Sequence, residues 1–211
     1  METKQSVTPE RRSARDRLLA AADELFYEGS IHTVGIERVI ERAGVAKASL
    51  YDNFGSKEEL IRAYLEARQA ARKARIAARL ATCATPRDRV LGVFDVMEAL
   101  MAAPGFRGCA FSRAAAESKP GTPAKNACDD ARGWMKELFV GLARDAGAAD
   151  PDHLANQLVL LYDGASVSGQ LGGGSSAAVA AREMAALLLD AATATGRAPG
   201  RRSASGSLRS R

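Results

Sequence analysis

Hydrophobic residues recur every three or four positions along nearly the whole chain, as expected for helices that each bury one face. The alternation of apolar and polar residues that marks a β-strand is missing. The first two stripes end at Gly29 and Gly44, and glycine readily adopts the left-handed conformation that closes a helix. The stripes are Leu18, Ala22, Leu25 and Phe26; Val39 and Ile40; Leu60, Ile61, Tyr64 and Leu65; Val90, Phe94, Met97 and Met101; Ala127, Ala131, Trp134, Leu138 and Leu142; Leu154, Leu158, Leu161 and Ala165; and Val179, Met184, Leu187 and Leu188. The pattern predicts an all-α fold of about nine helices.

Capping residues place the starts of the longer helices. Ser56 and Glu59 form a capping box, in which each side chain satisfies a free backbone N–H of the first turn. Three further starts put a capping side chain directly before a proline, which suits the first helical position. These pairs are Thr85-Pro86, Thr122-Pro123 and Asp150-Pro151.

The helices divide the chain into three parts. Short helices occupy residues 1–60, and the long helices occupy residues 61–195. Residues 196–211 are rich in Gly, Ser and Arg and cannot bury a core, so they are interpreted as a disordered basic tail. The glycine-rich run at 169–176 follows no strand and is interpreted as a linker between helices, not as a phosphate-binding loop.

Charge and composition narrow the class of protein. Of 211 residues, 46% are hydrophobic and 26% are charged, as in a globular protein, and the net charge is +5. The positive excess lies in residues 61–80, with 6 basic and 1 acidic side chains, and in the tail. Residues 1–60 carry 9 basic and 11 acidic groups, and we expect Arg11, Arg12 and Arg15 to offset that balance locally. Basic charge suits a polyanionic partner but does not identify one.

Several functions are disfavoured. No apolar run approaches the roughly 18 residues of a membrane span, and no secretory signal precedes the first helix. Cys83, Cys109 and Cys128 form no CxxC pair and fit reduced thiols, so we expect a cytoplasmic protein with no membrane partner. His32 and His153 are too few for a metal site, and the common hydrolase and nucleotide-binding motifs are absent. We therefore predict no cofactor, no metal and no catalytic residue.

Two short helices joined at Gly44 follow one helix and precede a long one, which predicts a helix-turn-helix unit. In such a unit the second helix enters the major groove, so it needs only enough length to present a few side chains. Its apolar residues Val45, Leu50 and Phe54 are expected to face inward. The side chains left facing outward are Lys47, Ala48, Ser49, Asp52 and Asn53.

Residues 18–60 resemble the DNA-binding domain of the tetracycline-repressor (TetR) family of transcriptional regulators. The residues that carry the resemblance are Ala43-Gly44-Val45, Leu50-Tyr51, Phe54, Ser56-Lys57 and Leu60. The run GFRGCAF at 105–111 and the helical remainder look like one C-terminal type of that family.

The resemblance assigns roles on double-stranded DNA. It implies that Lys47 and Ala48 contact base edges and that Tyr51 meets the backbone and thymine methyls. It places Ser49, Asn53 and Lys57 at phosphate-contact positions. Two departures concern the second helix, where Gly35 replaces the usual Ser or Thr and Glu37 replaces a basic residue. A carboxylate can accept a hydrogen bond from cytosine N4, so Glu37 and Asp52 are also candidate base contacts.

The resemblance also implies a pocket for a small apolar or amphipathic ligand in the C-terminal domain. The candidate lining residues are Phe94, Met97, Met101, Phe111, Trp134 and Tyr162, with Phe106 and Phe139 in the same group. For any single one of these residues core packing is the favoured interpretation, and the resemblance supports the pocket for the group as a whole. Asp163 could be an exposed charge or a polar anchor in the pocket.

The last two helices interleave Leu with Ala, Gly and Ser, which allows close approach of helices. The resemblance implies a homodimer through these helices, and such a dimer would read the two half-sites of a palindromic operator. The alternative is that they close the core of a monomer. The leading functional hypothesis is a repressor released from DNA by its ligand. The competing hypotheses are a redox-sensing regulator that uses Cys109 or Cys128 and a helical enzyme.

Overall fold

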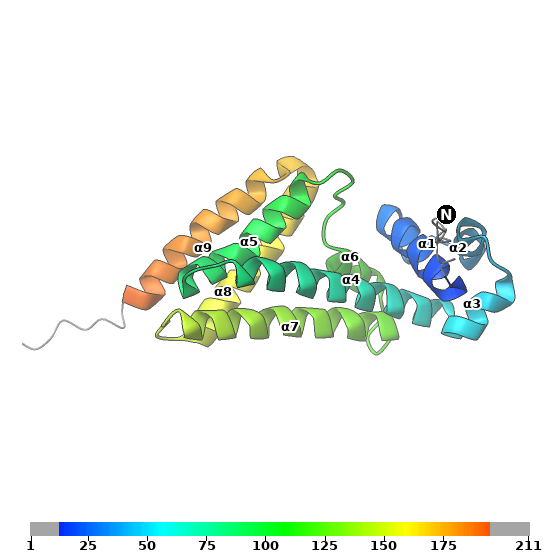
Figure 1. Cartoon of the computed structure of the whole chain (residues 1–211), viewed down its shortest axis with the longest axis horizontal. Coiled ribbons are helices and arrows are strands. Elements are labelled where there is room, and N and C mark those ends of the chain that lie inside the picture. Colours follow the sequence, from blue (N-terminus) through cyan, green and yellow to red (C-terminus); the bar gives the residue numbers. More distant parts are fainter. Residues whose placement is uncertain (1–12, 195–211) are drawn as a thin grey trace, which may run out of the picture.

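The computed structural model describes residues 13–194, and within that range the chain forms nine α-helices and no strand (Figure 1). The prediction of an all-α fold is therefore confirmed for the described part of the chain. The predicted tail at 196–211, and Arg11 and Arg12, lie outside the described residues.

The N-terminal unit consists of α1 (Ala14–Glu28), α2 (Ile36–Ala43) and α3 (Lys47–Phe54). Leu18, Phe26, Val39 and Leu50 from all three helices are buried together in one core. Gly44 ends α2 with φ 61°, a left-handed conformation that costs glycine no steric strain. The positive φ is the reason that this tight turn favours glycine, because a Cβ there would meet only the movable end of the Arg17 side chain.

Helix α4 (Lys57–Ala81) begins at Ser56, whose hydroxyl accepts a 3.1 Å hydrogen bond from the Glu59 N–H, as the capping box predicts. Its first turns bury Leu60 and Leu65 in the N-terminal core, and Ile76 lies in the C-terminal core. The predicted domain boundary at residue 60 thus lies within one continuous helix. Any tilt of α4 must therefore act on both cores.

The C-terminal core is built by α5 (Pro86–Ala102), α7 (Pro123–Asp145), α8 (Pro151–Ser168) and α9 (Ser176–Ala194), while α6 (Ala110–Glu117) packs on the N-terminal core. Thr85, Thr122 and Asp150 all cap their helices through the side chain, as predicted. Figure 1 shows α4 and α7 running side by side along the length of this domain.

The faces of α7 and α9 that are buried differ from the predicted apolar stripes. In α7 the buried spine runs through Ala131, Met135 and Phe139, which leaves Trp134 and Leu138 half-buried on its flank. In α9 the buried residues are Ala178, Ala181, Ala185 and Leu189, whereas Val179, Met184 and Leu187 are exposed. Small residues line the inner face of α9 because this helix packs closely on α5 and α8.

The glycine-rich run is more ordered than the predicted linker. Residues Gly169–Gly173 continue α8 as a π-helical turn, η1. Gly172 at φ 112° and Gly174 at φ 52° then redirect the chain into α9. The run forms a tight turn that reverses the chain between two packed helices, and its left-handed positions favour glycine.

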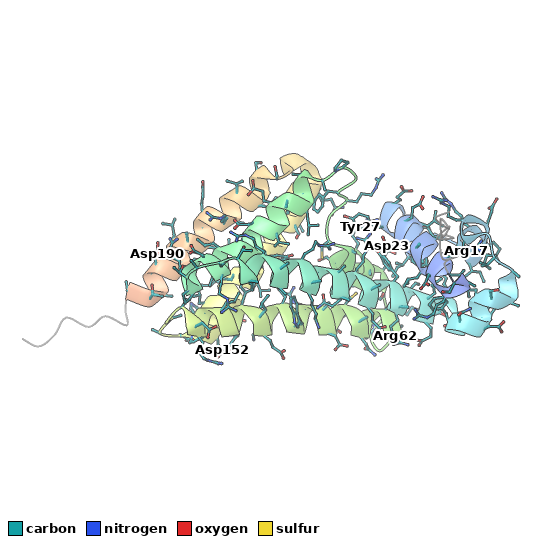
Figure 2. The ribbon with its side chains drawn as sticks, viewed as in Figure 1. Arg17, Asp23, Tyr27, Arg62, Asp152 and Asp190 are labelled. Atoms are coloured by element: carbon teal, nitrogen blue, oxygen red, sulfur yellow. The ribbon has the colours of Figure 1, made fainter. Side chains whose placement is uncertain are left out.

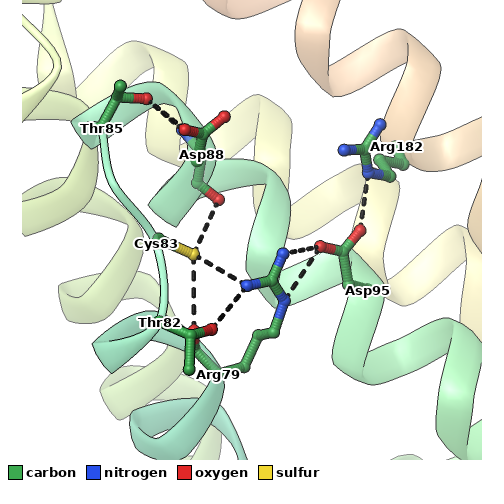
Figure 3. Close-up of polar contacts among 7 residues, drawn as sticks. All are labelled: Arg79, Thr82, Cys83, Thr85, Asp88, Asp95 and Arg182. Carbon is green, nitrogen blue, oxygen red and sulfur yellow. Dashed lines mark hydrogen bonds and ion pairs between the residues drawn. The ribbon is translucent and has the colours of Figure 1, made fainter.

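Asp95 links α4, α5 and α9 through ion pairs near the C-terminal end of α4 (Figure 3). Asp95 on α5 accepts from Nη2 of Arg79 on α4 at 2.7 Å and from Nε of Arg182 on α9 at 2.6 Å. The Asp95 side chain is one-quarter exposed, so water screens these pairs less than it would screen pairs on the open surface.

Candidate DNA-binding surface and ligand cavity

Helix α3 presents the predicted outward face to solvent. Lys47, Ala48, Asp52 and Asn53 are exposed, and Ser49 is half-buried. The matching inward residue, Leu50, is completely buried, with Val45 and Phe54 half-buried beside it. Tyr51 stands 44% exposed although its ring is apolar. An exposed aromatic ring on a short helix is a suitable contact for a partner surface.

Glu37 and Lys47 meet across the helix-turn-helix. Nζ of Lys47 lies 3.3 Å from Oε1 of Glu37, and both side chains are largely exposed. A hydrogen bond from its own backbone N–H, with a smaller contribution from Lys47, lowers the pKa of Glu37. The cap residue Gly35 supplies no side-chain hydrogen bond, so Glu37 partly replaces the missing hydroxyl at the start of α2. The predicted contact of Lys47 with a base edge would require its ammonium group to leave this carboxylate.

The predicted phosphate contacts are held close to the protein surface. Nζ of Lys57 donates to the His32 carbonyl at 3.3 Å, which holds the side chain between α4 and the loop before α2. Nδ2 of Asn53 donates to the Ser49 carbonyl at 2.7 Å, one turn earlier in α3. Both groups are therefore preorganised, although each must share or exchange a backbone partner to reach a phosphate.

Two arginines add positive charge around α3. Arg15 on α1 is exposed and stacks over the Phe54 ring, with Cζ 5.2 Å from the ring centroid. Its placement agrees with the expectation that it offsets the acidic groups of this domain. Arg38 on α2 is exposed and has no ion pair within the described residues. Nothing in the sequence pattern distinguishes Arg38, because its exposure depends on how α2 packs on α1.

A cavity of about 600 Å³ opens between the two domains. Helix α1 contributes Asp23 and Tyr27, α4 contributes three arginines, and α5, the loop that follows it, α6 and α8 supply most of the apolar wall. The lining residues used below are Tyr64, Arg68, Arg72, Arg75, Met97, Met101, Phe106, Phe111 and Tyr162.

The predicted pocket residues separate into two groups. Met97, Met101, Phe111 and Tyr162 line this cavity, whereas Phe94 and Trp134 do not. Phe94 is completely buried in the solid core, 5.9 Å from the Phe139 ring centroid. Trp134 borders a different hollow between α4 and α7, because its position in α7 turns it away from the inner face. The periodicity of the sequence could not make this distinction.

Three arginines from the basic run of α4 line one wall of the cavity. Arg68, Arg72 and Arg75 recur at helical spacing and share the face that lines the cavity. Arg68 donates to both carboxylate oxygens of Asp23 at 2.6 and 3.1 Å, and its Cζ lies 3.7 Å from the Tyr27 ring centroid. In Figure 2, Asp23 and Tyr27 lie on the side of α1 toward the C-terminal helices. This cluster connects the cavity wall to the DNA-binding unit.

The segment before α6 strengthens that connection. The Tyr27 hydroxyl donates to the Gly108 carbonyl at 3.1 Å and accepts from the Arg107 N–H at 3.0 Å. Nη1 of Arg113 on α6 donates to the Tyr27 carbonyl at 2.8 Å. Residues 107–113 are thus held against α1, and they also line the cavity through Gly108 and Phe111.

The cysteines occupy different environments. Cys109 is half-buried and lines the cavity. Cys128 is buried, and burial raises the pKa of its thiol to about 11, which keeps it protonated and weakly nucleophilic at neutral pH. Asp163 is paired with Arg132 and lies outside the main cavity. In residues 13–194 no cluster of His, Cys, Asp and Glu is suited to hold a metal ion.

Large apolar side chains of α8, η1 and α9 remain exposed on the C-terminal domain and are referred to as its apolar face. Leu160 on α8 is 73% exposed, Leu171 in η1 81%, and Leu187 on α9 65%. Large exposed aliphatic groups from neighbouring helices mark a surface suited to association. No helix within the described residues is both long enough and apolar enough to span a bilayer.

Comparison with known proteins decides the family. The family model described as bacterial regulatory proteins, tetR family, matches residues 18–64. The structure of SCO4454, a TetR-family transcriptional regulator from Streptomyces coelicolor, is 32% identical with a TM-score of 0.81. That match covers 85% of this chain and 96% of SCO4454. The chain belongs to the TetR family.

Two further relatives agree with this assignment. The TetR-type regulator sav143 from Streptomyces avermitilis is 35% identical with a TM-score of 0.75, over 86% of this chain and 98% of that one. The HTH-type transcriptional activator FasR of Mycolicibacterium smegmatis is 44% identical over 52 residues, 25% of this chain. The match spans only 24% of FasR. The TetR-family chain is a DNA-binding transcriptional regulator and not an enzyme, which confirms the predicted class.

Proposed function

We propose that this TetR-family chain is a homodimeric repressor that leaves a palindromic operator when a small amphipathic ligand fills the cavity between its domains. The observation that carries the proposal is the composition of the cavity wall. Asp23 and Tyr27 come from the DNA-binding unit, whereas Met97, Met101 and Tyr162 come from the C-terminal domain. A ligand in this space touches both units at once.

The ligand acts through unequal affinity for two arrangements of the domains, since a ligand that binds both equally shifts nothing. Arg68, Asp23 and the backbone around Gly108 form the contacts that differ most directly between such arrangements. Rotation of α1 against α4 would stretch these contacts and change the spacing of the two recognition helices in the dimer. A palindromic operator has fixed half-site spacing, so a small change would weaken binding.

The apolar face on α8, η1 and α9 supports the homodimer. Full burial of one leucine side chain contributes about 1.5–3 kcal/mol, so Leu160, Leu171 and Leu187 together offer a substantial driving force. Matching faces of two copies would pair around a twofold axis, which is the symmetry of a palindromic site.

Selection of bound sequences from random double-stranded DNA tests the proposal. The recovered sites should be inverted repeats, and the complex should contain two or four chains by light scattering. A transcription assay on a promoter that carries the recovered site then gives the sign of regulation. Recovery of no sequence preference, or of single half-sites bound by a monomer, would refute the proposal.

A second candidate is a redox-sensing regulator that uses Cys109, favoured by the position of this half-buried thiol on the cavity wall. Peroxide treatment of wild type and Cys109→Ser on the recovered operator separates the two. Release of wild type but not of the variant would support the thiol, whereas equal behaviour of both proteins would exclude it.

A further inference from the structure

Arg72 is a buried cation on the cavity wall. The residue is 9% exposed, and burial lowers the pKa of its guanidinium. Nε donates to Oε1 of Gln69 at 2.9 Å, and Nη2 donates to that same oxygen and to the Ala131 carbonyl, the latter at 2.9 Å. The Tyr162 hydroxyl lies beside the guanidinium and accepts a further side-chain hydrogen bond from it.

No carboxylate forms an ion pair with Arg72 in the described part of the chain, although the nearby Asp163, which is paired with Arg132, contributes some attraction. Its hydrogen-bond acceptors are neutral, namely amide oxygens and the Tyr162 hydroxyl, and its Cζ lies 4.4 Å from the Phe111 ring centroid and 5.6 Å from that of Trp134. The hydroxyl of Tyr162 beside it is neutral as well, because burial raises the pKa of that phenol to about 12. Gln69 turns its oxygen toward Arg72 and leaves its own buried Nε2 without a partner. An uncompensated buried charge of this kind is costly.

The acidic groups near the cavity are already engaged. Asp23 holds Arg68, Asp16 accepts from the Ser13 hydroxyl at 2.7 Å, and Asp163 pairs with Arg132. Arg75, at the exposed rim, forms no ion pair within residues 13–194. The positive charge that remains inside the cavity is therefore available to a ligand.

The part of the wall supplied by α5, the loop after it and α6 is mostly apolar. Met97, Met101, Phe106 and Phe111 surround a space of about 600 Å³, which is in the range of small-molecule sites. Flexible methionines adapt to an apolar body of varied shape. The ligand should therefore have one charged end and one large apolar end.

We propose that the effector of this protein is an amphipathic monoanion, with its carboxylate or sulfonate held by Arg72 and its apolar or aromatic body held between α5 and α6. This inference rests on the proposed function, because it names the ligand class for the same cavity. Arg75 assists the approach of the anion at the rim. A guanidinium binds a carboxylate or sulfonate through parallel N–H bonds, which a neutral analogue cannot replace.

Two dyes with the same aromatic body test the charge directly. The fluorophore 8-anilinonaphthalene-1-sulfonate carries the anion, and N-phenyl-1-naphthylamine is its uncharged parent. Wild type should bind the sulfonate at least as tightly as the more apolar parent. The variant Arg72→Gln should bind the sulfonate about tenfold or more weakly, the loss expected for one charge-assisted hydrogen-bonded contact. Its affinity for the neutral dye should stay within about twofold of wild type on the same basis.

Matched variants separate charge from damage to the fold. Arg62→Gln removes the same charge from α4 outside the cavity and should leave both dyes unaffected. Arg72→Lys keeps the charge without the planar fork and should bind the sulfonate with intermediate affinity. The proposal is overturned if Arg72→Gln weakens both dyes equally or neither. It is also overturned if wild type prefers the neutral dye, a result that requires no folded variant.

DNA binding by the unliganded protein is measured separately on operator sequences recovered by selection. Loss of dye discrimination with intact operator binding removes the ligand class and leaves the proposed function standing. If the dyes are discriminated as expected but no specific DNA site is recovered, the ligand class is supported and the proposed function is refuted.

Discussion

Glu37→Gln tests how the DNA-binding surface uses an acidic residue. In the free protein the Glu37 carboxylate is bonded to its own backbone N–H and lies 3.3 Å from Nζ of Lys47. Its lowered pKa keeps it charged throughout the neutral range. If it accepts from a cytosine N4 group, the substitution should relax the preference at one base pair of each half-site.

The same substitution should strengthen binding to non-specific DNA. It removes one negative charge from the phosphate-facing surface and frees Lys47 from its partner. Each charge neutralised on duplex DNA contributes about −0.9 to the slope of log K against log salt, and one such unit corresponds to about fivefold at 0.15 M salt. Folding should change little, because the pair is exposed and such pairs contribute little to stability.

The assay is a salt titration of affinity on the selected operator, on its single-base variants and on a scrambled duplex. Glu183→Gln, an exposed residue of α9 with no ion pair within the described residues, makes the same change of net charge away from α3. It should leave the slope unchanged. A uniform loss of affinity for Glu37→Gln across all duplexes would refute both parts of the reasoning, since it would make Glu37 a structural cap alone.

Four other outcomes follow from the structure. Lys57→Ala should weaken binding to every duplex alike and reduce the salt slope by about one, and a changed base preference would instead assign it to a base edge. Leu187→Glu should convert the dimer to a monomer in light scattering, with an unchanged helical circular-dichroism spectrum, because a carboxylate then faces an apolar partner surface. Trp134→Phe should leave the affinities for both dyes within about twofold, since Trp134 lies outside the main cavity, phenylalanine keeps an aromatic ring beside Arg72, and substitutions away from a site usually change free energies by no more than about 0.5 kcal/mol. For Cys128 the folded pKa of about 11 exceeds the ordinary value of 9, so its contribution to stability is complete below pH 9 and is lost as pH rises from 9 to 11. Urea denaturation at pH 8 and pH 10.5 should therefore show a smaller alkaline loss of stability for Cys128→Ala than for wild type.

Local signals in the sequence were sufficient for much of the fold. Capping by Ser56, Thr85, Thr122 and Asp150 depends on side chains within three residues, and all four caps are present. The left-handed turn at Gly44 and the inward position of Leu50 likewise follow from short-range geometry. Such interactions are encoded next to the residues they involve, so periodicity and capping rules identify them.

The residues that line the cavity could not all be predicted from helical patterns. An amphipathic stripe shows which face of a helix is apolar, but it does not distinguish a solid core from a cavity wall, and Phe94 and Trp134 were assigned to the wall on that basis. The exposed Val179, Met184 and Leu187 show the same limit in α9, where alanines pack inward. Which side of an apolar helix is covered depends on its neighbours and not on its own pattern.

The sequence was sufficient for most of the helices, the capped starts of four of them, the helix-turn-helix and the side chains that α3 presents, because each depends on contacts within a few residues, whereas it gave no signal for α6. Only the tertiary structure shows that Arg68, Arg72 and Arg75 line a cavity, that Asp23 pairs with Arg68, and that Arg72 forms no ion pair within residues 13–194. These properties arise where α1, α4 and α7 meet, between residues 45 or more positions apart in the chain. A basic run has the same appearance in the sequence whether it is solvated or buried. Only the packing of distant helices determines the dielectric environment and the partners that give such a charge its function.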